Sequence, residues 1–548
     1  MSKTAQKAGS TQQHKEGSFR YAEKRRTATC LFADRVATTA LEEYRRVVPQ
    51  VHRDKHKHEC VAAILAHFPS SVQEGGGATC TQREGTLQVI GLGVGTKFLP
   101  ESILREEAKS GGCDASTTRY GERVRDCHAE VLARRAFRWQ LAKEIHDDLL
   151  PRRQSSEYIS DEQQANCSRY IPLLRRLEDK SVGSRSYGLK PGVTLHFYSS
   201  SAPCGNATLK KFAKMQKEKF DASLGLDEWP RTNSHEMING HAIREGQFSL
   251  LLKKDNSASA CADRSIDGES RNDFGPDANV KAKGKRWPAN ESDDWCPPGC
   301  TIVGSKRGSI HTCSDKIARW NCLGLQGSLL SSIVDAPLYM STLTVGRKMT
   351  NVICRRAVCC RAWGYGDVAT PMAKEPKRTK IEESREENVS KCFTTRNGYK
   401  LNHPVIMGTS VYIDEEGVLD MSGDRTTGQD FRFESNLCWV MAGNWETAEC
   451  IDGKTGFACV FDPTCEDLMP IGHGSKRGVS KISTAALTEQ FASVAELSGS
   501  KLELNIPTFS LAALRGVKLT VSPEYENAKE DLISKHRVFR QWARRTAT

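Results

Sequence analysis

The stretch DCHAEVLARRAFRWQLAKEI occupies residues 126–145 and decides the fold. Its apolar side chains recur every three or four residues, which is the spacing of one face of an α-helix. Asp126 is a residue type that caps helices, so we expect a long helix from Cys127 to about Ile145. The beginning of that helix then carries His128, a potential metal ligand, and the carboxylate of Glu130.

A strand that ends next to a cysteine is the second decisive feature. Residues 194–201 read TLHFYSSS, which predicts a strand, and Pro203 then stands at the expected first turn of another helix. Cys204 follows at that helix start, where the helix dipole favours a thiolate. Zinc accepts imidazole and thiolate ligands, and it keeps one position for water when the protein supplies three ligands. The H-x-E and P-C elements together therefore predict a zinc site.

The third ligand does not stand at its usual spacing. Zinc deaminases of nucleobases carry P-C-x-x-C, but here Cys204 is followed by Gly205, Asn206 and Ala207. Our candidate is Cys313 in the segment HTCSDKIARWN, residues 311–321. Spacing alone does not single it out.

Three motifs occur in order along the chain: HAE followed by Arg134 and Arg135, S-x-PCG around Cys204, and CSDKIARWN-x-LG-x-QG from Cys313. They resemble the deaminase domain shared by RNA-editing adenosine deaminases and the eukaryotic tRNA-specific adenosine deaminases, from roughly Leu31 to the C-terminus. The resemblance implies zinc ligation by His128, Cys204 and Cys313. It also implies that Glu130 shuttles protons to ring nitrogen 1 of a flipped-out adenine and to the departing ammonia, while zinc activates the attacking water.

The same resemblance implies a substrate contact. Gly95 and Thr96, in GVGTK, match the family loop that contacts the flipped nucleotide. A threonine hydroxyl there can meet a ribose hydroxyl and so distinguish RNA from DNA. Two departures from the family pattern stand beside the ligands, Arg125 before the HAE motif and Asn206 after PCG.

A buried polyanion is expected near the C-terminal helix. Tyr525, Leu532 and Lys535 follow one another at helical spacing, which places a lysine in an otherwise apolar stripe. A buried ammonium needs a counter-charge. The resemblance implies that the counter-charge is inositol hexakisphosphate. The residues that match its binding set are Arg134, Arg135, Lys316, Arg319, Trp320, Gln326, Tyr525, Lys529 and Lys535.

The expected fold class is α/β, a cytidine-deaminase-like three-layer sheet with flanking helices, elaborated by N- and C-terminal helical additions. Periodicity predicts two helices between Leu31 and Phe68 and a strand over residues 87–94. Residues 1–28 are expected to be a disordered basic leader, and residues 29–548 a single adenosine deaminase (editase) domain. Polar segments at 253–294 and 366–391 are expected to be disordered insertions.

Composition sets limits on the class of protein. No apolar run approaches a membrane span and no signal peptide opens the chain, so we expect an intracellular protein of the nucleus or cytoplasm that is not secreted. The 20 cysteines are scattered, and the pairs Cys296 with Cys300 and Cys359 with Cys360 lack further ligands, which favours free thiols over a second metal site. The net charge of +12 favours a polyanionic partner, although a basic surface for solubility has the same charge.

The start of the chain favours tRNA as that partner. The polar leader passes directly into predicted helices, without a double-stranded-RNA-binding module, as in the tRNA enzymes. The resemblance then implies deamination at position 37, the purine 3′ of the anticodon of alanine tRNA, with no membrane and no obligate protein partner. Editing of structured messenger RNA remains an alternative. So does a catalytically silent zinc-containing RNA-binding protein, although a structural site has no need of Glu130.

Overall fold

The computed structural model describes residues 28–55, 59–70, 85–99, 120–150, 170–177, 185–205, 241–242, 301–302, 311–347, 351–359, 398–411, 436–461, 468–470, 478–498 and 510–535, with single positions 103, 207, 349 and 395. The expected insertions at 253–294 and 366–391 and nearly all of the expected leader lie outside these residues. Within them, no helix is long and apolar enough to cross a membrane.

The elements alternate irregularly between helix and strand along the chain. The helices are α2 (Ala28–Val47), α3 (Gln50–Lys55), α5 (Ala129–Leu149), α10 (Cys313–Leu323), α11 (Gly327–Leu330), α12 (Asn351–Val358), α14 (Thr484–Leu497), α15 (Leu511–Val521) and α16 (Pro523–Lys535). The strands of the main sheet are β1 (Val61–Phe68), β2 (Thr86–Val94), β7 (Thr194–Ser201), β10 (Met340–Arg347), β11 (Val405–Gly408), β12 (Leu437–Ala442), β13 (Glu449–Asp452), β14 (Ala458–Phe461) and β15 (Leu468–Pro470). The two-stranded ribbons are formed by β3 (Thr96–Phe98), β4 (Asp126–His128), β5 (Leu174–Arg176), β6 (Tyr187–Leu189), β8 (His241–Ala242) and β9 (Thr301–Ile302).

One large mixed sheet organises the described residues. Its strand order is β11-β10-β7-β1-β2-β12-β13-β14-β15. The strands β11, β10 and β7 run parallel, and all the remaining neighbours pair antiparallel. The prediction of an α/β fold class is confirmed by this mixed sheet and its helices.

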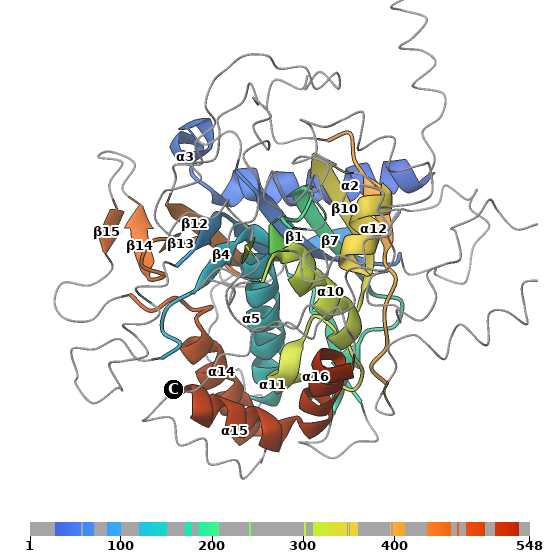
Figure 1. Cartoon of the computed structure of the whole chain (residues 1–548), viewed down its shortest axis with the longest axis vertical. Coiled ribbons are helices and arrows are strands. Elements are labelled where there is room, and N and C mark those ends of the chain that lie inside the picture. Colours follow the sequence, from blue (N-terminus) through green and yellow to red (C-terminus); the bar gives the residue numbers. More distant parts are fainter. Residues whose placement is uncertain are drawn as a thin grey trace, which may run out of the picture.

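Helices cover both faces of the sheet (Figure 1). Strand β1 shows how one sequence serves both faces, because its side chains alternate. Ala62, Ile64 and Ala66 belong to an apolar cluster that includes Phe137 of α5. Their neighbours Val61, Ala63 and Leu65 belong to a second cluster that includes Leu41 of α2. The sheet is therefore a buried middle layer between α2 and α5.

The last three helices gather around the far end of α5 (Figure 1). Helix α14 packs along α5, and α16 lies against α10 and α11. Tyr525, Ala528 and Leu532, which belong to the stripe expected on the C-terminal helix, are buried side chains of α16. The side chain of Lys535, the lysine expected in that stripe, lies outside the described residues. This packing brings cationic side chains of α15 and α16 towards α5 and α10.

Two sequence predictions are wrong. The second predicted N-terminal helix is the strand β1, whereas the first is α2. An apolar run as short as VAAILAHF has no decisive period, and it lies in the sheet interior with strand partners on both sides. Asp126 does not cap α5, because Asp126–His128 pair as β4 with Thr96–Phe98 and His128 takes the cap position.

The predicted strand over 87–94 is confirmed as β2 and the strand at 194–201 as β7. Residues 203–205 are not helical, and the rest of the helix expected after Pro203 lies outside the described residues apart from Ala207.

Candidate active site

The ribbon of β3 and β4 places the HAE motif beside the GVGT loop. Thr96 stands directly opposite His128 in the strand register. The carbonyl oxygen of Gly95 accepts the backbone N–H of Ala129 at 2.9 Å, so the loop also meets the first residue of α5. The predicted substrate-contact residues Gly95 and Thr96 thus lie next to a predicted metal ligand, although they are 32 positions or more apart in the sequence.

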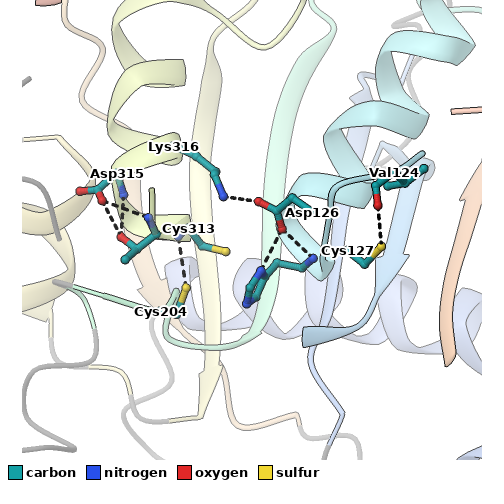
Figure 2. Close-up of polar contacts among 9 residues, drawn as sticks. Val124, Asp126, Cys127, Cys204, Cys313, Asp315 and Lys316 are labelled. Atoms are coloured by element: carbon teal, nitrogen blue, oxygen red, sulfur yellow. Dashed lines mark hydrogen bonds and ion pairs between the residues drawn. The ribbon is translucent and has the colours of Figure 1, made fainter. Parts of the chain in front are cut away.

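His128 is held by a half-buried carboxylate, that of Asp126. Its Nδ1 lies 2.9 Å from Oδ1 of Asp126, whose other oxygen accepts a hydrogen bond from the ammonium of Lys316 on α10 (Figure 2). Burial favours the neutral carboxyl, but the charges of Lys316 and His128 override it and hold the pKa of Asp126 far below its usual range. The carboxylate orients the imidazole and leaves Nε2 buried, with no hydrogen-bond partner among the described residues. Carboxylate–histidine pairs of this kind are the usual support of a metal-bound histidine.

Cys204 and Cys313 meet at the start of α10. The backbone N–H of Cys313 donates to Sγ of Cys204 at 3.2 Å (Figure 2). The N–H of Ser314 donates to the carbonyl oxygen of Cys204 at 3.1 Å. Burial alone would raise the pKa of the Cys204 thiol, but hydrogen bonds from Cys313 and the nearby charge of His128 lower it below its ordinary value. A thiolate at Cys204 is therefore favoured.

Local sequence explains why the loop at Cys204 closes onto α10. Thr312 and Asp315 form a capping box, in which each side chain bonds the other's backbone N–H. Gly205 has φ of 90°, and a Cβ there would lie 2.3 Å from Oγ1 of Thr312. Only glycine fits a left-handed conformation at so close an approach. The close contact between Gly205 of PCG and Thr312 before CSDK thus holds the Cys204 loop against the start of α10.

The three predicted ligands belong to neighbouring elements. Among the described residues, no group of three or more His, Cys, Asp or Glu side chains is assembled closely enough to hold a metal ion. The donors nevertheless suit zinc, which prefers imidazole and thiolate ligands, because Nε2 of His128 is buried without a partner among the described residues and the pKa of Cys204 is lowered. Glu130 lies in the first turn of α5, two positions after His128, and is 5% exposed.

A second polar cluster lies along the first half of α5 and beside α10, beyond Glu130 and Lys316 in the sequence. We define the cation cluster as Arg134, Arg138, Arg319, Lys518 and Lys529, which are all half-buried. The guanidinium of Arg134 lies 4.9 Å from the ring centroid of Trp320, and its Nε has no hydrogen-bond partner among the described residues. Gly327 leaves room for two of these cations, since its Cβ position is 3.1 Å from atoms of both Arg134 and Arg138.

Among the described residues, the cation cluster holds more positive than negative charge. Burial lowers the pKa of Arg134 to about 9; Tyr525 partly offsets this, while repulsion from Arg138 and Arg319 adds to it. Burial and the charges of Lys529 and Arg138 lower the pKa of Lys518 to about 7. Glu526, bonded to Lys529, offsets only part of this positive charge. An anion would relieve both the repulsion and the desolvation.

Several residues of the predicted polyanion set lie elsewhere. Arg135 donates to the carbonyl oxygen of Ile482 at 2.7 Å and to the hydroxyl of Thr484. Lys316 is bonded to Asp126. The side chain of Lys535 is outside the described residues. The amide of Gln326 is used within the α11 region, where it donates to Leu323 and Ser331 and accepts from Leu338. Arg134, Arg319, Trp320, Tyr525 and Lys529 do come together.

Sequence reasoning missed three residues. Arg138 follows Arg134 by one helical turn, a spacing that is visible in the sequence and places both on one face. Asp126 was interpreted only as a helix cap, although its position two residues before a candidate ligand is also visible. Lys518 has no such signal, because its place in the cation cluster depends on how α15 packs.

Comparison with known proteins is consistent with these motifs. A sequence model of the family described as the Adenosine-deaminase (editase) domain matches residues 92–546. The double-stranded RNA-specific adenosine deaminase of Mus musculus is 24% identical over 336 residues, which cover 61% of this chain and 20% of that protein. The tRNA-specific adenosine deaminase 1 of Mus musculus is 22% identical over 360 residues, which cover 58% of this chain and 65% of that protein.

A third relative, the double-stranded RNA-specific editase Adar of Drosophila melanogaster, is 27% identical over 241 residues, covering 44% of this chain and 26% of that protein. The chain thus spans about a fifth of the double-stranded RNA-specific relative from mouse and slightly under two thirds of the tRNA-specific one.

Proposed function

Because the chain belongs to the adenosine-deaminase (editase) domain family, we propose that it is a zinc-dependent enzyme that converts adenosine to inosine in RNA, and that tRNA is its substrate. The observation that carries this proposal is the convergence of three motifs. HAE, PCG and CSDK come from separate parts of the chain. Asp126 contacts both His128 of HAE and Lys316 of CSDK, and Cys204 of PCG accepts the backbone N–H of Cys313 in CSDK. We propose further that the sheet and its flanking helices form an elaborated cytidine-deaminase-like domain.

Zinc would be held by His128, Cys204 and Cys313, and when bound it supplies the Lewis acidity that activates water for attack on carbon 6 of adenine. The chain prepares these ligands in advance. Asp126 fixes the ring of His128, and the start of α10 favours the thiolate of Cys204. Lys316 neutralises Asp126, which keeps that carboxylate bound to the histidine.

Glu130 would carry the protons of the reaction. A carboxyl group buried beside the ligands can protonate ring nitrogen 1 and then the leaving ammonia, as in other zinc deaminases. Its place at the N-terminus of α5 fixes the direction of the side chain. Thr96, whose place opposite His128 supports this role, would meet the ribose of the flipped nucleotide.

Relatives of both substrate classes match this chain. The alignment takes in 65% of the tRNA-specific enzyme but only 20% of the double-stranded RNA-specific one, which favours tRNA. Within tRNA, we propose position 37, 3′ of the anticodon of alanine tRNA. Editing of structured messenger RNA is the second candidate, supported by the relatives named for double-stranded RNA.

The cation cluster supports a structural polyanion. The five cations are half-buried, they repel one another, and this lowers the pKa values of Arg134 and Lys518. Holding them together without an anion is therefore costly in free energy. We propose inositol hexakisphosphate, because its phosphates match several guanidinium and ammonium groups at once. Arg134, Arg138, Arg319, Lys518 and Lys529 would contact it, and Trp320 would stack against Arg134.

The substrate is tested by sequencing. Purified protein and its Glu130→Gln variant are incubated with total tRNA and, separately, with a long RNA duplex, and reverse transcription then reads inosine as guanosine. We expect conversion by the wild type alone, at one anticodon-loop adenosine. Conversion confined to the duplex would replace tRNA by structured RNA, and the absence of any conversion would favour the catalytically silent RNA-binding protein.

A further inference from the structure

A serine lies where the apolar pattern of β7 calls for a hydrophobic side chain. Alternate residues of a strand share a face, so Leu195, Phe197 and Ser199 point the same way. The first two belong to the apolar cluster that contains Ala133 and Phe137 of α5. Ser199 is 3% exposed and stands in the middle of the sheet, between Ala62 of β1 and Val345 of β10. Apolar packing therefore does not account for the hydroxyl at this position.

The hydroxyl of Ser199 lies beside Glu130, the general acid and base of the proposed reaction. Its Oγ lies 3.5 Å from Oε1 of Glu130 and 2.7 Å from the carbonyl oxygen of Ser201. A serine has one proton but two acceptor lone pairs. The hydroxyl can therefore donate to a carboxylate, or donate to Ser201 and accept from a carboxyl that carries a proton. The same contact holds Glu130 on either side of a proton transfer.

We infer that Ser199 is a positioning residue for Glu130, which keeps the carboxyl group aimed at the reacting base throughout the reaction. This inference rests on the proposed function, because it assigns Ser199 a role in the chemistry of that same site. Glu130 extends from the first turn of α5 into a buried space, and Ser199 supplies it with a side-chain contact from the sheet. A carboxyl group held in one orientation populates unproductive rotamers less often. We therefore expect the contact to raise the rate of the chemical step, and hence kcat, rather than to change substrate binding.

The sheet provides a matched control. Ser200 is 2% exposed, faces the other side of β7, and its Oγ accepts the backbone N–H of Val61 at 2.9 Å. Ser200→Ala removes a buried hydroxyl from the same strand without touching Glu130. Ser199→Thr keeps the hydroxyl and adds a methyl group that strands accept readily.

Steady-state kinetics on an RNA that the wild type deaminates test the inference. We expect Ser199→Ala to lower kcat by about ten-fold, the scale of one hydrogen bond to a charged group, with KM changed less than about two-fold. Ser199→Thr should recover at least about half of the wild-type kcat, and Ser200→Ala should keep it. Unchanged kcat in Ser199→Ala, an effect on KM alone, or an equal loss in Ser200→Ala would overturn the positioning role.

A second readout needs no turnover. In crystal structures, the carboxyl of Glu130 should occupy one conformation in the wild type, at hydrogen-bonding distance from Ser199, and several in Ser199→Ala. Identical ordered conformations in both proteins would contradict the inference. If the wild type deaminates no RNA at all, the proposed function fails, and this crystallographic comparison still decides whether Ser199 positions Glu130.

Discussion

Replacement of Lys518 by methionine tests the cation cluster through the sign of its effect. Burial next to Lys529 and Arg138 lowers the pKa of Lys518 from 10.5 to about 7. A shift of this size corresponds to roughly 5 kcal/mol, of which we expect about half to remain because solvent screens the half-buried ammonium. Without a bound anion, Lys518→Met should therefore raise the free energy of unfolding at pH 7 by about 2 kcal/mol.

The pH dependence has a definite direction. Between pH 7 and pH 10.5 the unfolded chain binds a proton at Lys518 that the folded protein does not. The free energy of unfolding of the anion-free wild type should then rise with pH in this window, by up to about 1.4 kcal/mol per pH unit. Lys518→Met should lack this contribution. A bound polyanion would keep the ammonium charged and remove the slope.

Urea unfolding at pH 7, 8 and 9 measures both effects, with and without inositol hexakisphosphate. The ligand should stabilise the wild type by about 3 kcal/mol at a hundred-fold excess over its Kd, and in its presence Lys518→Met should become the less stable protein. Lys400→Met, at an exposed lysine outside the cluster, is the control and should change neither quantity. The reasoning is refuted if Lys518→Met is destabilising without the ligand, or if the ligand stabilises neither protein.

Three further changes have defined outcomes. Asp126→Asn removes the charge that orients His128 and should weaken zinc binding by about 10–100-fold in a chelator competition; unchanged affinity would show that the contact is incidental. Glu144 accepts the backbone N–H groups of Leu173 and Leu174, and burial raises its pKa to about 7. The folded state thus binds the extra proton, so the free energy of unfolding should fall between pH 4.5 and 7, by up to about 1.4 kcal/mol per pH unit. Glu144→Gln should flatten that fall, and an unaltered pH profile would exclude the assignment. Gly205→Ala forces a Cβ against Thr312 and should lower zinc content together with the thermal midpoint. Its control is Gly516→Ala in α15, where the added Cβ meets nothing within 4 Å and should stabilise the helix by about 0.5–1 kcal/mol.

Sequence alone was sufficient for the parts of the fold that have a clear period or motif. Helix α5 was predicted from its own segment of sequence, although it begins at Ala129 rather than Cys127. Strand β1 was mistaken for a helix because an eight-residue, mostly apolar segment has no decisive period, and only its two neighbours in the sheet determine its state. The order of the sheet, in which β12 pairs with β2 across more than 300 residues of sequence, has no local signal.

The site divides in the same way. His128, Glu130, Cys204 and Cys313 were accessible because each belongs to a motif. Their supports were not, since Lys316 reaches Asp126 across 190 positions of sequence and Ser199 reaches Glu130 across 69. The predicted polyanion set included residues of α5, α10 and α16 that belong to the cation cluster. Lys518 was not predicted, because it joins the cluster through the packing of α15 and belongs to no sequence motif.

The most direct test of the central claim is the formation of inosine itself. Zinc-loaded wild type and Glu130→Gln, a variant of equal size without the proton carrier, are incubated with an adenosine-containing tRNA transcript. The RNA is then digested to nucleosides and analysed by mass spectrometry. We predict more than one inosine per wild-type molecule and none above background for Glu130→Gln. Absence of inosine with the wild type, or equal amounts with both proteins, would contradict the assignment of Glu130 and of the reaction.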